Sequence, residues 1–81
     1  MKINVRINGE LARGLGTSRL QVRLAEPATL ADLLDQLRQQ YPRSSPKFDS
    51  AIPFSAGQHL APTASLADGQ EIALLMPVAG G

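Results

Sequence analysis

The sequence predicts a single small α+β domain, in which one main helix covers one face of a mixed sheet. Three observations predict this class: strand-like alternation near the N-terminus, one helical stripe of leucines, and a strongly apolar run close to the C-terminus. A length of 81 residues with 43% hydrophobic residues allows one modest core and no second domain. We therefore expect the domain to span residues 1–76 and a flexible tail to span residues 77–81.

The N-terminal third contains two segments in which apolar and polar residues alternate with a period of two. Residues 1–7 and residues 19–24 both show this pattern, which indicates strands with one buried face. The simplest pairing of the two strands is antiparallel. The connection is longer than a tight hairpin and has room for one short helical turn at Leu11 and Leu15.

The middle of the chain carries an amphipathic helix. Its apolar side chains fall on one helical stripe: Leu30, Leu33, Leu34, Leu37 and Tyr41. Thr29 can cap the start, Asp32 completes a pattern like a capping box, and Pro42 ends the helix. The stripe could be a seam for a partner, but the chain offers no other main helix to close its core. We therefore expect the leucines to pack on the sheet.

The C-terminal half is expected to complete the sheet. Residues 43–47 are typical of a turn, and short strands are expected at residues 51–55 and 59–61. Residues 71–76 form the most hydrophobic run, which fits a central strand. Because a single helix covers only one face of a small sheet, we expect Leu75 to be exposed on the other face.

This order of elements predicts a β-grasp (ubiquitin-like) arrangement. The first and last strands then lie parallel at the centre of the sheet, and the last strand runs directly into the C-terminal end. Gly80 and Gly81 have no Cβ, so they form a slim thread. At about 3.3 Å per extended residue, residues 77–81 reach roughly 16 Å, enough to carry the terminal carboxylate into a buried site of another protein.

Composition argues against several classes of function. Eight basic and seven acidic residues give a net charge of +1 without a basic run, so we expect neither nucleic-acid nor membrane binding. No cysteine is present, and no metal site can be built around the single histidine, His59. Asp32, Asp35 and Asp68 suit helix starts and turns and make no catalytic pair. No long apolar segment is present, which predicts a cytoplasmic protein.

The most specific motif lies in residues 66–81, which read LADGQEIALLMPVAGG. A leucine, an Asp-Gly turn, an acidic residue before a hydrophobic strand and a final Pro-Val-x-Gly-Gly resemble the MoaD/ThiS sulfur-carrier family, most closely its molybdopterin synthase small subunits. The resemblance covers the whole length. The chain departs from it at Leu74 and Leu75, where the family often has aromatic residues, and at Met76, where a second proline is common. These departures bear on the choice of partner more than on the fold.

The resemblance implies chemistry at the C-terminus. An E1-like adenylyltransferase would use ATP to adenylate the Gly81 carboxylate, and a sulfur donor would convert it to a thiocarboxylate. The tail residues Pro77, Val78, Ala79 and Gly80 would enter the large subunit of molybdopterin synthase, where a pterin precursor takes the sulfur in molybdenum cofactor biosynthesis. The catalytic acid and base would belong to that partner, and no cofactor or metal would be bound permanently.

The exposed face of the last strand is the expected docking surface, because the helix leaves that face uncovered. We expect Leu75, with Leu60 or His59 beside it, to form the apolar part of this interface together with Pro77 and Val78.

Other functions remain open at this point. The acceptor of the sulfur could be the thiazole of thiamine, a cysteine precursor or a tRNA base, although the last-strand motif favours the pterin pathway. A ubiquitin-like modifier, with Gly81 joined to lysines of target proteins, needs the same activated end. A β-grasp interaction domain whose glycines do no chemistry is the third possibility.

Overall fold

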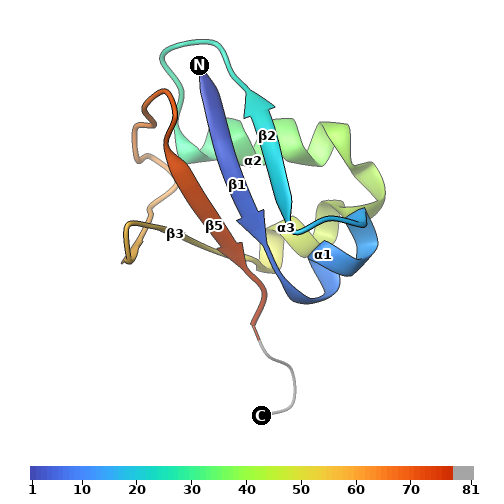
Figure 1. Cartoon of the computed structure of the whole chain (residues 1–81). Coiled ribbons are helices and arrows are strands. Elements are labelled where there is room, and N and C mark those ends of the chain that lie inside the picture. Colours follow the sequence, from blue (N-terminus) through green and yellow to red (C-terminus); the bar gives the residue numbers. More distant parts are fainter. Residues whose placement is uncertain (78–81) are drawn as a thin grey trace.

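The structure is a computed structural model that describes residues 1–77, and in these residues five strands form one mixed sheet. The strands are β1 (Lys2–Ile7), β2 (Arg19–Arg23), β3 (Ile52–Ser55), β4 (Gln58–His59) and β5 (Glu71–Leu75). The helices are α1 (Gly9–Leu15), α2 (Leu30–Gln40) and α3 (Ser45–Ser50), the last preceded by a short 3₁₀ helix, η1 (Pro42–Ser44). The strands lie in the order β2-β1-β5-β3-β4, with the helices on one face (Figure 1). This arrangement confirms the β-grasp fold.

The two central strands are the first and the last, as the sequence predicts. β1 and β5 pair in parallel, from Asn4 opposite Glu71 to Ile7 opposite Leu74. β2 pairs antiparallel with the outer side of β1, and β3 pairs antiparallel with the outer side of β5. The strand that leads to the C-terminal end is therefore supported on both sides.

The core fills the space between the sheet and the helices. Alternate residues of β1 (Ile3, Val5 and Ile7) are buried, as the period of two requires. The helices and the other strands contribute Leu11, Val22, Leu30, Leu33, Leu37, Phe48, Ile72 and Leu74, and the loop before β5 contributes Leu66. Burial of each large side chain stabilises the fold by about 1.5–3 kcal/mol relative to exposure, so this layer accounts for the packing of the leucine stripe on the sheet.

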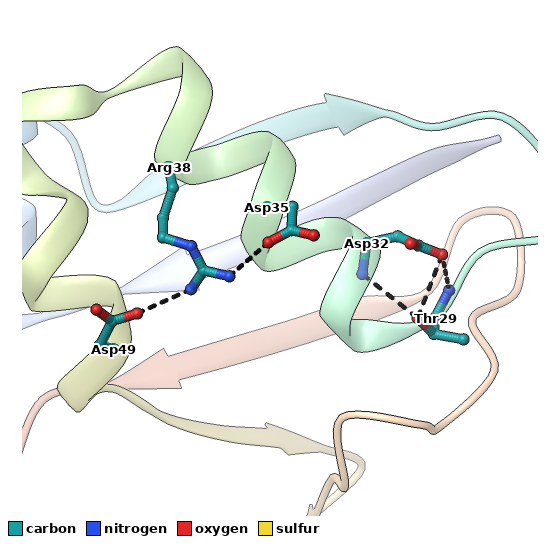
Figure 2. Close-up of polar contacts among 5 residues, drawn as sticks. All are labelled: Thr29, Asp32, Asp35, Arg38 and Asp49. Atoms are coloured by element: carbon teal, nitrogen blue, oxygen red, sulfur yellow. Dashed lines mark hydrogen bonds and ion pairs between the residues drawn. The ribbon is translucent and has the colours of Figure 1, made fainter.

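The start of α2 follows the predicted capping box. The Thr29 hydroxyl accepts a hydrogen bond from the Asp32 amide at 3.3 Å, and the Asp32 carboxylate accepts one from the Thr29 amide at 2.9 Å (Figure 2). Two amides at the helix start are thereby satisfied, and the carboxylate lies at the positive end of the helix dipole.

The expectation of a turn at residues 43–47 is wrong, because this segment belongs to η1 and α3. Pro46 lies in the first turn of α3, where proline is tolerated, and α3 buries Phe48 in the core. Arg38 of α2 joins the two helices: its guanidinium is 2.6 Å from the Asp35 carboxylate and 2.9 Å from the Asp49 carboxylate of α3 (Figure 2). The buried Phe48 ring and the ion pair with Arg38 both hold α3 against the rest of the domain.

Two other segments differ in extent from the prediction. The connection after β1 forms α1, of 7 residues, with Leu11 fully buried, so the expected helical turn is present and longer. The strand expected at residues 59–61 is instead β4, which starts at Gln58. Ala56 and Gly57 form a two-residue turn with φ of 51° and 77°, which starts the return strand one residue early.

Candidate functional site

The candidate site is the place where β5 leaves the sheet, with the uncovered sheet face beside it. β5 ends at Leu75, Met76 is half-buried and Pro77 is exposed. Pro77 is the last described residue, so the four predicted tail residues Val78, Ala79, Gly80 and Gly81 lie outside the described residues.

The start of β5 is attached to β1 by the Asp-Gly turn of the C-terminal motif. The Asp68 carboxylate accepts a hydrogen bond from the Lys2 amide at 2.7 Å, and the Gly69 amide donates one to the Lys2 carbonyl, also at 2.7 Å. Gly69 has a φ of 80°, a conformation that suits glycine. The Asp-Gly pair thus satisfies both backbone groups of Lys2 and sets where β5 begins along β1.

The end of β5 is attached by a side chain of the residue that directly follows β1. The Asn8 side-chain oxygen accepts a hydrogen bond from the Met76 amide at 2.7 Å. A Cβ atom added to Gly9 would lie 3.5 Å from the Met76 Cβ, an ordinary van der Waals distance, so Gly9 and Met76 are neighbours at the start of α1. We call the contact of Asn8 and Gly9 with Met76 the exit clamp. It holds the residue immediately before Pro77.

Apolar side chains gather on the uncovered face over β5, β3 and β4. Leu75 and Ile52 are register partners with 37% and 38% of their surface exposed. Phe54 lies opposite Ala73 on one side and opposite His59 on the other, with its ring centroid 5.7 Å from that of His59 in an edge-on arrangement. We call these five residues the open-face patch. An exposed apolar patch of this kind is typical of a surface that another protein covers.

Of the residues that we predicted for the interface, the structure places some on the uncovered face and one against the core. Leu75 is exposed as expected, and His59 lies on the same face. Leu60 is half-buried and packs against the core. Ile52 and Phe54 were missed: their alternation was visible, but which face they occupy depends on the pairing of β3 with β5.

The charged side of this face lies over β1. Arg6 and Glu71 form an exposed ion pair, with the guanidinium nitrogen 3.4 Å from the carboxylate oxygen. An open hollow of about 620 Å³ lies between the ion pair and the open-face patch, and its lining includes Arg6, Asn8, Phe54, Glu71, Ala73 and Leu75. An apolar surface with an ion pair at its edge matches the usual organisation of a protein interface.

Within residues 1–77, no three His, Cys, Asp or Glu side chains come together in a way that could hold a metal ion. In the same part of the chain, no helix combines the length and the apolar character needed to cross a membrane.

The fold agrees with known proteins that this chain is similar to. The ThiS family model matches residues 5–81. SAMP1 from Haloferax volcanii is 28% identical, with a TM-score of 0.88 over 100% of both chains. A putative molybdopterin converting factor subunit 1 from Pyrococcus furiosus is 17% identical, with a TM-score of 0.86 over 96% of this chain and 99% of that one.

A chain in the complex of subunits 1 and 2 of molybdopterin-converting factor from Helicobacter pylori is 21% identical, with a TM-score of 0.70 over 100% of both chains. The likeness to the Helicobacter pylori chain and to the Pyrococcus furiosus protein shows the fold alone. No curated protein matches the sequence. Because the family model spans nearly the whole length of the chain, this protein belongs to the ThiS family.

Proposed function

We propose that this protein is a sulfur carrier whose Gly81 carboxylate is adenylated by an E1-like enzyme and then converted to a thiocarboxylate. The observation that carries the proposal is a Gly-Gly end that follows a central strand attached to β1 at its start and its end, in a member of the ThiS family. The folded body would present the end, and residues 77–81 would carry the chemistry into other proteins.

The two steps have a simple chemical basis. A carboxylate is a poor electrophile, so one of its oxygens first attacks the α-phosphorus of ATP and pyrophosphate leaves. A sulfide donor then attacks the carbonyl carbon of the mixed anhydride, and AMP leaves with the bonding electron pair. The product is a terminal thiocarboxylate. The absence of cysteine from the chain means that no thiol of its own competes for the activated carbonyl. ATP is a substrate of the activating enzyme, and the reaction belongs to the cytoplasm.

The proposed acceptor is a pterin precursor bound by the large subunit of molybdopterin synthase, which makes this chain the small subunit. The pattern of residues 66–81 supports this choice over thiamine, cysteine or tRNA pathways. We propose that the open-face patch docks on the partner through Leu75 and His59. Pro77, Val78, Ala79 and Gly80 would then enter the partner's active site. Leu60 packs against the core, so we assign it no part in this docking.

A second candidate function is supported by the likeness to SAMP1, a small archaeal modifier protein, over the full length of both chains. In a protein modifier, a lysine amine of a target attacks the activated Gly81 carbonyl in place of sulfur. Both functions share the adenylation step and differ in the nucleophile that follows it.

Intact mass spectrometry tests the proposal and separates the two functions. The full chain is incubated with ATP, the E1-like enzyme of the same organism and sulfide. We expect a mass increase equal to replacement of one oxygen by sulfur, absent from a chain that lacks Gly81. Transfer of this sulfur to a pterin precursor, with the large subunit present, would support the synthase role. Covalent conjugates to lysines in a lysate, without sulfur transfer, would support the modifier. A chain that is never adenylated would contradict both.

A further inference from the structure

Asn8 occupies a position where its side chain would ordinarily serve its own helix. It is the N-cap of α1, with an extended backbone (φ −138°, ψ −179°), and asparagine at such a position commonly accepts a hydrogen bond from an amide in the first helical turn. In α1 the Asn8 side chain makes no such bond. Its oxygen accepts a hydrogen bond from the Met76 amide instead, 68 residues along the chain. The side chain therefore serves β5 and not α1.

This contact lies just beyond the paired part of the central strands. The register of β1 and β5 ends at Ile7 opposite Leu74, and Met76 is two residues further on. The Asn8 oxygen thus supplies an acceptor to the β5 segment where backbone pairing with β1 has ended. Gly9 lies beside the Met76 Cβ, and the Met76 side chain packs against the core. The Met76 backbone is therefore held by the hydrogen bond to Asn8, and the Met76 side chain is held by packing.

We propose that Asn8 is a positioning residue for the C-terminal tail. By holding Met76, it sets the point and the direction from which the chain continues at Pro77, whose ring restricts its own φ. This inference rests on the proposed adenylation of Gly81. When the domain is docked on the activating enzyme, a restrained exit raises the fraction of time that the carboxylate spends at the ATP site. Without the Asn8 contact, Met76 and Pro77 move more freely and the carboxylate samples a larger volume.

Two variants of the full chain separate this role from simple stabilisation. Asn8→Leu has a similar size but no acceptor, whereas Asn8→Asp keeps the acceptor oxygen. Asn4→Leu is a matched control, because the Asn4 side chain of β1 also accepts one exposed hydrogen bond, from Gln21 at 3.3 Å, but lies away from the exit clamp. The measurement is pyrophosphate release by the E1-like enzyme, with kcat and KM determined for each carrier variant.

We expect Asn8→Leu to lower kcat about two- to tenfold, the range that corresponds to one hydrogen bond, while KM is unchanged. Docking through the open-face patch does not require the clamp, which is why KM is expected to hold. Asn8→Asp and Asn4→Leu are expected to retain the wild-type kcat. In amide hydrogen exchange, the Met76 amide should exchange faster in Asn8→Leu and at the wild-type rate in Asn8→Asp.

The possible outcomes are distinguishable. Faster exchange at Met76 with an unchanged kcat would overturn the positioning role while leaving the carrier function intact. A rise in KM with constant kcat would also overturn it, because Asn8 would then be an ordinary contact residue in the hollow. Equal losses of kcat in Asn8→Asp and Asn8→Leu would overturn the proposal, because the acceptor oxygen would then play no part. A wild-type chain that is not adenylated would overturn the proposed function, and the positioning role with it.

Discussion

At the residue scale, single side chains and backbone angles decide where the elements begin and end. Asp68, Asn8 and Thr29 are short polar residues whose oxygens accept hydrogen bonds from backbone amides. Each is exposed or only partly buried, so each bond contributes about 0.5–1.5 kcal/mol. These residues act mainly by selecting one geometry, since the core supplies most of the stability.

Ala56 adopts a backbone conformation that destabilises the turn between β3 and β4. Its φ of 51° is unfavourable for a residue with a Cβ, and the next residue, Gly57, has a φ of 77°. Positive φ at both positions is the signature of a type I′ turn, for which Asn-Gly is preferred. We expect Ala56→Asn to raise the free energy of unfolding by about 0.5–1 kcal/mol, measured by urea denaturation. Ala56→Val should lower it, and an equal or opposite order would contradict the turn assignment.

At the element scale, the parallel pair β1 and β5 is held at both ends by groups outside the backbone ladder. Parallel strands far apart in sequence have no hairpin to set their register. The Asp68-Gly69 turn contacts Lys2 at one end, and the exit clamp contacts Met76 at the other. The Asp-Gly pair of this chain therefore has a structural role, separate from any chemistry at the C-terminus.

Removal of the Asp68 carboxylate tests this element. Asp68→Ala leaves the Lys2 amide without its acceptor, and we expect a loss of about 0.5–1.5 kcal/mol in the free energy of unfolding. Asp68→Asn keeps an acceptor and should lose less. The Lys2 amide should also exchange faster with solvent in the alanine variant. Indistinguishable stabilities for alanine and asparagine would show that the hydrogen bond does not hold β5.

The pair β1 and β2 contains an electrostatic conflict. Arg6 and Arg19 are directly opposite each other in the antiparallel register, and like charges so placed are destabilising. Arg19→Glu turns the repulsion into attraction, so we expect a gain of about 0.2–1 kcal/mol in the free energy of unfolding, smaller at high salt. In an Arg6→Gln background the gain should disappear. A gain that persists there would arise from another part of the chain.

At the scale of the whole molecule, the sequence predicts the architecture well, because the periodic spacing of apolar residues shows directly which side chains are buried. Alternation in β1 and the leucine stripe of α2 identify the faces that pack together, and these assignments are confirmed. α3 was missed because serine and proline around Phe48 resemble a turn, and only tertiary packing makes that segment helical. The contact of Asn8 with Met76 leaves no local signal, since it joins residues 68 positions apart. The open-face patch depends on the β3–β5 register for the same reason.

The division of the sheet into a covered and an uncovered face leads to the last prediction. Leu75 is on the uncovered face with 37% of its surface exposed, whereas Leu74, its neighbour, is fully buried. We expect Leu75→Asp to change the free energy of unfolding by less than about 1 kcal/mol, because a surface site tolerates polarity. Its affinity for the proposed partner, the large subunit of molybdopterin synthase, should fall at least about tenfold, the usual effect of losing an apolar anchor and placing a charge in an interface.

Isothermal titration calorimetry of the full chain with the large subunit measures this affinity. Gln58→Asp provides the matched control, because Gln58 is an exposed residue of β4 that does not belong to the open-face patch. If Leu75→Asp binds as tightly as the wild type, the uncovered face is not the docking surface. Equal weakening of binding by Leu75→Asp and Gln58→Asp would indicate a general effect of negative charge. It would contradict docking through the open-face patch, because only Leu75 belongs to that patch.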